Sequence, residues 1–143
     1  MDPGQKDDRF VRNDEDKKRG LHFPLLDAFR CAFAGLFKTV ARQRNIKIHL
    51  AVALLALVLG FVLRIPLSSW LAVIICIVVV FCVECLNTAL ETLVDLVSPG
   101  YHELAKVAKD CAAGAVLVSV IGSLVVAGLV FGAAVLQLIA ALG

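Results

Sequence analysis

The feature that most constrains this chain is the nearly continuous apolar sequence from Leu50 to the C-terminus. Short polar patches interrupt it, and from Cys111 to Gly143 there is no charged side chain at all. Hydrophobic residues make up 60% of the 143 residues, whereas roughly 45–50% is usual for a soluble domain. A chain of this length cannot bury so much apolar surface in one small soluble core. We therefore predict an integral membrane protein whose solvent is the lipid bilayer.

The chain divides into a charged tail and one membrane domain. Residues 1–22 contain too few apolar side chains to pack, so we expect them to be disordered. Residues 23–143 form the membrane domain, and apolar residues at helical spacing predict that it is all-α. The expected elements are an amphipathic helix over about 24–44 and membrane spans over about 48–63, 69–97 and 103–140.

The amphipathic helix is expected to lie on the inner leaflet, with an apolar stripe against the lipid and basic side chains at its flanks. An alternative is that the same stripe packs on the membrane bundle, and both arrangements are compatible with the sequence. The last helical pattern is long, about 60 Å from Glu103 to the C-terminus at 1.5 Å per residue. We therefore expect its first turns to project from the membrane and its far end to fray or break.

The positive charges set the expected orientation. Eleven of the 14 Lys and Arg residues lie within residues 1–47, and the other three are Arg64, Lys106 and Lys109. By the positive-inside rule, the N-terminal segment and the loop near Lys106 are cytoplasmic. Acidic residues are interleaved in the basic tail and no aromatic platform accompanies it, which argues against nucleic-acid binding.

One face of the second span carries a row of polar side chains. At 100° per residue, the members of this row fall within about 100° of arc, on an otherwise apolar helix: Glu84, Asn87, Thr88, Glu91, Asp95 and Ser98. A charge at mid-membrane costs roughly 3 kcal/mol even on the lenient insertion scale. Glu84 lies about 16 Å up the helix from Asp95, so only Asp95 can stand at the water boundary. The pattern indicates a functional site rather than a seam that only pairs helices.

Clustered carboxylates with an amide suit three tasks: holding Mg²⁺, acting as a general base, or relaying protons and ions. The following segment favours the first two. Lys106, Lys109 and Asp110 share one helix face just after the turn, and Lys109 is expected to approach the carboxylates of the preceding helix. Cations beside metal-binding carboxylates suit a phosphate group. The chain has no P-loop pattern, so any nucleotide must be held in another way.

These residues resemble the prokaryotic membrane family of diacylglycerol and undecaprenol kinases. The resemblance is carried by Glu84-Cys85-Leu86-Asn87-Thr88-Ala89-Leu90-Glu91 with Val94-Asp95, and by Tyr101-His102-Glu103-Leu104-Ala105 followed by Lys106-Val107-Ala108-Lys109-Asp110. It extends upstream through Phe33, Gly35-Leu36 and Arg44-Asn45 to His49. The match covers about residues 25–130.

The resemblance implies an ATP-dependent lipid kinase of the bacterial cell membrane. It implies a homotrimer with active sites between protomers at the cytoplasmic surface, Mg²⁺ as cofactor, and a lipid alcohol as acceptor. By position, Glu84 would be the general base and Glu91 a metal ligand. Asn87, Asp95, Lys109 and Asp110 would order the site and bind ATP, with Lys109 on the phosphates.

One departure from the family pattern concerns the metal. Many members have a glutamate before the Arg-Asn pair, whereas this chain has Gln43. An amide oxygen can still ligate a metal, but without charge. The resemblance favours undecaprenol over diacylglycerol as substrate. The alternatives are a small oligomeric transporter and a non-catalytic membrane scaffold.

Overall fold

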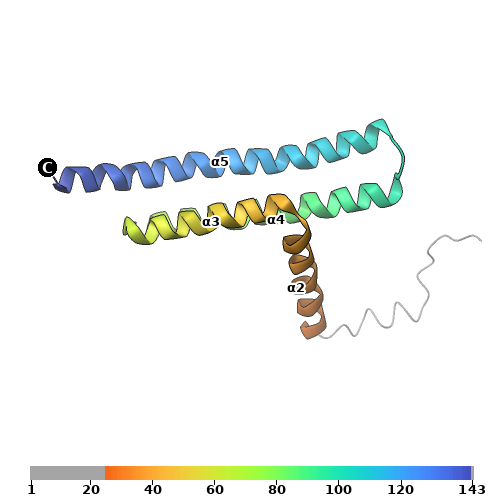
Figure 1. Cartoon of the computed structure of the whole chain (residues 1–143), viewed down its shortest axis with the longest axis horizontal. Coiled ribbons are helices and arrows are strands. Elements are labelled where there is room, and N and C mark those ends of the chain that lie inside the picture. The colour runs from red at the N-terminus through yellow and green to blue at the C-terminus, as the bar shows by residue number, and fades with distance from the viewer. Residues whose placement is uncertain (1–24, 143) are drawn as a thin grey trace, which may run out of the picture. The chain divides into compact units, whose positions relative to one another are not determined.

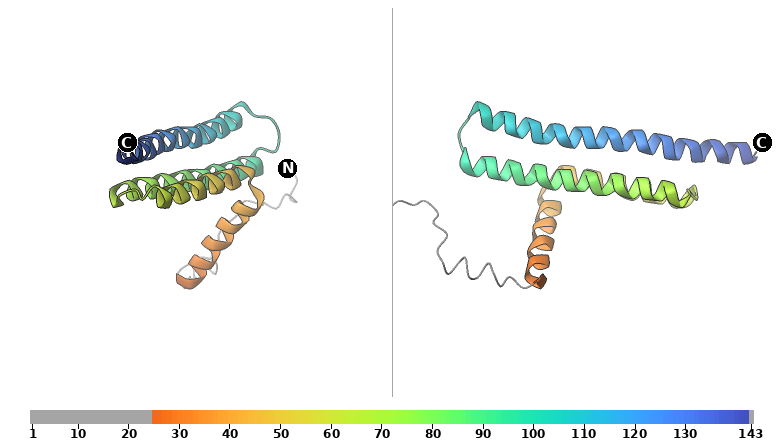
Figure 2. Two further views of the ribbon diagram at one scale, coloured as in Figure 1. Left: turned by 60° about the vertical axis from the view of Figure 1, so that its left-hand side comes forward. Right: turned by 180° about the vertical axis from the view of Figure 1, so that it is seen from behind.

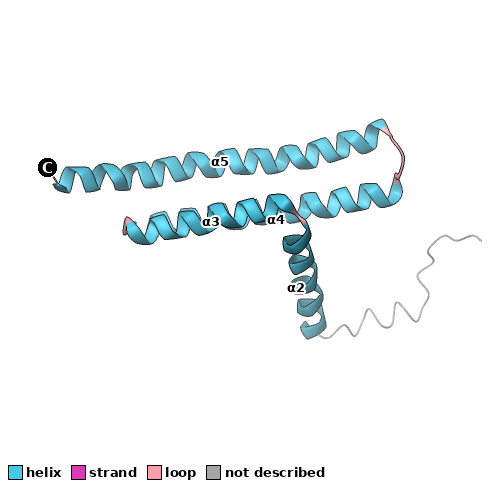
Figure 3. Ribbon diagram, in the orientation of Figure 1, coloured by secondary structure: helices cyan, strands magenta, loops and turns pink. Residues whose placement is uncertain are grey.

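The computed structural model describes residues 25–142, and these are almost entirely helical (Figures 1 and 3). No strand occurs in this part of the chain, which confirms the prediction of an all-α protein. The predicted tail at residues 1–22 lies outside the described residues. The helices are α2 (Leu25–Arg42), α3 (Arg44–Val62), α4 (Leu67–Val97) and α5 (Glu103–Leu142).

Helix α2 has the amphipathic pattern that the sequence predicts. Asp27 lies in its first turn, where a negative charge interacts favourably with the helix dipole. Its apolar stripe is exposed and includes Phe29, Phe33 and Phe37. That stripe needs a cover of lipid or protein, and its placement on a bilayer stays a prediction.

Helices α3, α4 and α5 are each long and apolar enough to cross a membrane. This agrees with the three spans expected from the sequence. Helix α3 begins at Arg44, earlier than the expected start near residue 48, because the polar residues up to Lys47 continue the helix. Helix α4 begins at Leu67, directly after Pro66, whose fixed φ favours the first position before a helix.

A tight turn joins α3 to α4 as an antiparallel pair (Figure 2). Arg64 adopts a positive φ of 50° there. The pair closes tightly at Gly60, where a Cβ atom would lie 2.8 Å from the Trp70 ring. Buried residues recur every seven positions on α3, at Ile46, Ala53 and Gly60, and α4 buries Val73, Val80, Glu84 and Asn87. This repeat is the seam along which α3 and α4 pack.

Helices α4 and α5 run side by side and are joined by the segment around Pro99 and Gly100 (Figures 1 and 2). His102 precedes α5, and its Nδ1 accepts the backbone N–H of Leu104 at 3.2 Å, which satisfies one of the free donors at the helix start. The expected break at the far end is wrong for the described residues, because α5 continues unbroken to Leu142. No proline follows Glu103 to interrupt its backbone hydrogen bonds.

The three spans bury few apolar side chains among themselves. The buried hydrophobic residues number only six in the described chain: Ile46, Ala53, Ile65, Val73, Val80 and Ala112. Most of the large apolar side chains of α3, α4 and α5 face outward instead. Such a surface requires lipid or further protein around it, as expected for a membrane protein.

Candidate functional site

The polar row of α4 changes from buried to exposed along the helix. Glu84 and Asn87 are 2% and 6% exposed, Glu91 is half-buried, and Asp95 lies in the open with 66% of its side chain exposed. The gradient runs toward the turn that leads to α5. It agrees with the expectation that Asp95 stands at the water boundary and Glu84 does not. The site is therefore a polar path that enters the helix bundle from one end and stops at Glu84.

The buried end of the row holds two acceptor atoms without partners. The Asn87 Nδ2 group donates a hydrogen bond to Glu91 Oε1 at 3.2 Å, one helical turn further on. This contact fixes the amide, and its Oδ1 is left buried without a hydrogen bond. Glu84 Oε2 is in the same state. Buried acceptors without partners cost roughly 1–3 kcal/mol each, so this end of the row is energetically unfavourable in the ligand-free chain.

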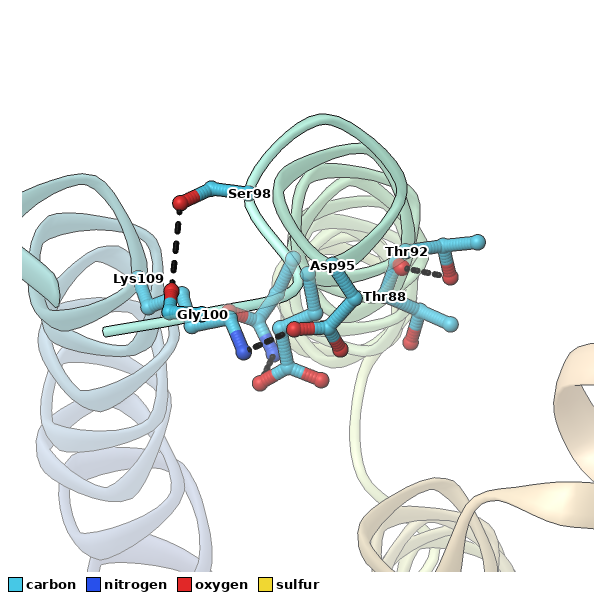
Figure 4. A network of polar contacts seen from close by, with 8 residues as sticks. Thr88, Thr92, Asp95, Ser98, Gly100 and Lys109 are labelled. Atoms are coloured by element: carbon cyan, nitrogen blue, oxygen red, sulfur yellow. Dashed lines mark hydrogen bonds and ion pairs between the residues drawn. The ribbon is translucent and has the colours of Figure 1, made fainter. Parts of the chain in front are cut away.

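Two threonines on α4 satisfy their own hydroxyls within the helix. Thr88 Oγ1 donates to the backbone carbonyl of Glu84 at 3.0 Å. Thr92 Oγ1 donates to the backbone carbonyl of Thr88 at 2.8 Å (Figure 4). Such bonds to the preceding turn are common for Ser and Thr inside helices. Thr88 belongs to the polar row by its angle, but its hydroxyl proton is already committed. The chemically available groups of the row are its carboxylates and the Asn87 amide.

The exposed end of the row is tied to α5. Lys109 Nζ and Asp95 Oδ1 form an ion pair at 2.5 Å, and the two side chains point toward each other across the gap between the helices (Figure 4). The sequence prediction that Lys109 approaches the carboxylates of α4 is confirmed. Nearby, the Ser98 hydroxyl donates to the Gly100 carbonyl at 3.2 Å in the connecting segment. A cation is thus held beside the acidic row.

Three other candidates lie apart from this network. Lys106 and Asp110 are exposed on α5 and take no part in the contacts described above. Gln43 is the residue that precedes α3, and its backbone N–H donates to the Thr39 carbonyl at 2.9 Å. Its side chain makes no capping hydrogen bond and does not join Glu91 in the described chain. The structure therefore assembles Glu84, Asn87, Glu91, Asp95 and Lys109, but not the other three.

The site contains carboxylate and amide oxygens, which are the kind of ligand that Mg²⁺ prefers. Within residues 25–142, no three His, Cys, Asp or Glu side chains converge closely enough to hold a metal by themselves. Mg²⁺ does not need such a cage, because it is commonly bound by one or two carboxylates together with substrate phosphates and waters. Glu91 offers that kind of half-site, and Asp95, one turn further along α4, is paired with Lys109 of α5. The residues present fit a metal that arrives with a phosphate substrate.

Two features of the site were not anticipated from the sequence. An apolar groove runs among α3, α4 and α5, and His49 and Phe81 lie in its wall. Ile46 is completely buried and, with Glu84, is one of the two largest side chains in that state. The sequence signal for the groove and for the burial of Ile46 was the helical spacing of α3, which places Ile46, His49 and Ala53 on one face. All five cysteines are free of disulfide bonds.

Fold and site together define a polytopic membrane protein with a carboxylate and amide site at one end of its helix bundle. Comparison with known proteins shows to which family the chain belongs. A family model described as prokaryotic diacylglycerol kinase matches residues 30–131. The chain belongs to this family, and the resemblance seen in its motifs is confirmed.

Individual relatives agree with this assignment. The chain is 43% identical over 105 residues to a diacylglycerol kinase of Synechocystis, covering 73% of this chain and 60% of the relative. It is 38% identical over 104 residues to the undecaprenol kinase of Bacillus subtilis, covering 73% and 85% respectively. A diacylglycerol kinase of Escherichia coli is 38% identical over 68 residues, which is 48% of this chain and 56% of the relative. The family is one of lipid kinases, and the relatives include both diacylglycerol kinases and an undecaprenol kinase.

Proposed function

We propose that this protein transfers the γ-phosphate of ATP to the hydroxyl of a membrane lipid, with undecaprenol as the first candidate substrate and diacylglycerol as the second. The observation that carries the proposal is the buried pair of unpartnered acceptors, Glu84 Oε2 and Asn87 Oδ1, beside Glu91. A lipid hydroxyl supplies the donor that Glu84 lacks. Family membership supports the same activity.

Glu84 is the general base in this proposal. It is enclosed on α4 and its carboxylate has one oxygen without a hydrogen bond. A base must lie within hydrogen-bond reach of the proton that it accepts, and a hydroxyl at Oε2 meets that condition. Asn87 holds Glu91 through its Nδ2 group and leaves its own Oδ1 for the reacting groups.

Lys109 and Asp95 form the phosphate end of the proposed site. Phosphoryl transfer depends mainly on positioning and on neutralising the charge of the phosphates. Lys109 is 38% exposed and points from α5 toward Asp95 of α4 (Figure 4), where an incoming triphosphate would reach it. Asp95 holds this cation in place before ATP arrives. Asp110, one residue further along the exposed face, is assigned to the nucleoside part of ATP.

Glu91 is assigned to Mg²⁺, together with ATP phosphate oxygens. The metal would neutralise phosphate charge during transfer. Gln43 is the second ligand proposed from the family pattern, through its amide oxygen. Because that oxygen carries no charge, this chain should bind the metal more weakly than a relative with glutamate at the same position.

The proposed setting is the cytoplasmic face of a bacterial cell membrane. The Lys and Arg distribution supports this orientation, and ATP reaches the site from that side. The lipid alcohol reaches it from the inner leaflet. A homotrimer with sites between protomers is part of the proposal, supported by the large outward-facing apolar surface of α3, α4 and α5.

The test is phosphate transfer from labelled ATP by purified protein, with undecaprenol and diacylglycerol offered separately in the presence of Mg²⁺. One lipid should be labelled, and Glu84→Gln should abolish the transfer. Glu103→Gln is the matched control, because Glu103 is an exposed glutamate in the first turn of α5. Absence of labelling with both lipids in several membrane mimetics would reject the proposal.

A transporter is not favoured by the geometry. A conducting path should be polar along its length, whereas Trp70 to Val83 is apolar. The hydroxyls of Ser119 and Ser123 on α5 donate to carbonyls of their own helix, at 2.7 and 2.8 Å. They are therefore not free to line a route for ions. The polar row ends at Glu84, as a reaction site does.

A further inference from the structure

His49 is a nitrogen-bearing side chain inside the bundle that the proposed reaction does not yet use. It is half-buried and lies in the wall of the apolar groove among α3, α4 and α5. It shares one face of α3 with the buried residues Ile46 and Ala53. Apart from Cys76 and Ser123, the other side chains of the groove wall are apolar. An imidazole in such surroundings needs a polar neighbour.

The register of α3 against α4 shows which neighbour is near. Gly60 and Trp70 are in contact at the turn end of the pair. Because the two helices are antiparallel, equal steps back from Gly60 along α3 and forward from Trp70 along α4 reach residues at the same level. Such steps bring Ile46 level with Glu84. These are the two largest fully buried side chains, as expected of residues that cover each other. The same count brings His49 level with Phe81, and both lie in the wall of the groove.

His49 and Glu84 therefore differ by three residues in height, about 4.5 Å along the helix axis. Side chains of an α-helix lean toward its N-terminus. Because α3 and α4 are antiparallel, facing side chains lean in opposite directions. The side chain of His49 leans toward the level of Glu84, and that of Glu84 leans toward the level of His49. The two side chains therefore lean toward each other's level along the helix pair.

Glu84 lacks a hydrogen-bond donor for one of its carboxylate oxygens. Its Oε2 atom is buried and has no hydrogen-bond donor in the ligand-free chain. The Asn87 amide nitrogen on the next turn is engaged with Glu91, and the Thr88 hydroxyl is engaged with the Glu84 backbone. A ring N–H from the facing helix is a donor of the right kind, since hydrogen bonds to a carboxylate are short and strong.

We propose that His49 is a positioning residue, which rotates to donate a ring N–H to the carboxylate of Glu84 and aims it at the lipid hydroxyl. The inference rests on the proposed function, because it gives Glu84 its task as base. His49 touches neither ATP nor the reacting phosphorus. Its removal should therefore reduce kcat and leave the KM for ATP unchanged.

The kinetic test compares variants of the full chain in bilayer nanodiscs. His49→Leu should lower kcat by roughly tenfold to a hundredfold, the value of a hydrogen bond to a charged group. His49→Gln keeps an N–H donor and should restore most of the loss. Ser123→Ala is the matched control, since it changes a polar side chain in the same groove wall on α5. It should leave kcat unchanged.

A spectroscopic test reads the contact without requiring activity. In protein with ¹⁵N-labelled histidine rings, Glu84→Gln should shift the His49 ring signals, and Asp95→Asn should not. The His49→Leu sample assigns the signal among the three histidines. A shift in an inactive protein would support the contact while the proposed function fails. Unshifted His49 signals in Glu84→Gln would overturn the inference.

Discussion

Gly60 offers a direct measure of how tightly the α3 and α4 pair is closed. A Cβ atom added there would lie 2.8 and 2.9 Å from two atoms of the Trp70 ring and 3.2 Å from Ile65 Cδ1. Ordinary contacts between carbon atoms are about 3.5–4.0 Å. The indole would have to move by more than half an ångström, and its face is already held against Phe61, with ring centroids 4.7 Å apart.

Gly60→Ala should therefore destabilise the protein despite its better helix propensity. Overpacking of a tight site costs roughly 1–3 kcal/mol, and replacing glycine by alanine inside a helix returns up to about 1 kcal/mol. With the full propensity gain, the expected net loss is up to about 2 kcal/mol. Gly122→Ala is the control, because no atom lies within 4 Å of its added Cβ and only the propensity gain remains.

The assay is the free energy of unfolding from SDS titration in mixed micelles, followed by helical circular dichroism. The double variant with Trp70→Leu gives a further check, since the shorter side chain removes the clash. Gly60→Ala should cost much less in that background than in the wild-type chain. If Gly60→Ala is as harmless as Gly122→Ala, the close approach at the turn is not a feature of the protein in its membrane.

Four further predictions concern the phosphate and metal end of the site. Gln43→Glu should lower the Mg²⁺ concentration for half-maximal activity by roughly tenfold, and an unchanged midpoint would show that residue 43 is no ligand. Lys109→Met should raise the KM for ATP by roughly tenfold or more, and equal KM values in wild type and Lys109→Met would contradict the assignment. Asp95→Asn should change the unfolding free energy by less than about 1 kcal/mol, since the ion pair with Lys109 is largely exposed. Treatment with EDTA should abolish transfer and excess Mg²⁺ should restore it, and full activity in EDTA would remove the metal from the site.

Much of this arrangement follows from the sequence because the membrane limits the choices. Long apolar segments that cross a bilayer have to be helices, so the three spans are visible in hydropathy alone. The 100° step of a helix places Glu84, Asn87, Glu91 and Asp95 on one face without any structure. The contact of Lys109 with this face follows from the short turn around Pro99 and Gly100, which brings the start of α5 beside the end of α4.

The parts that the sequence did not predict depend on packing between helices. The choice of Asp95, rather than Glu91, as the partner of Lys109 depends on the relative rotation and height of α4 and α5. The burial of Glu84 depends on the register of α3, which is set by the fit of Gly60 against Trp70 at the other end of the pair. A pattern along one helix contains neither quantity. The unbroken course of α5 was also missed, because its length alone suggested an interruption.

The same helix, α4, serves two opposite physical requirements, and their division along its length explains where the site is. Toward the turn with α3, its contacts are apolar and close, with Val73 and Val80 in the seam. Toward α5, the seam ends in Glu84 and Asn87, which are equally enclosed but keep an unpartnered oxygen each. Leucine at these two positions would remove that cost and complete the seam. A polar end to a packed seam lowers stability, and this cost supports the proposal that a group engaged during the reaction supplies the missing hydrogen bonds.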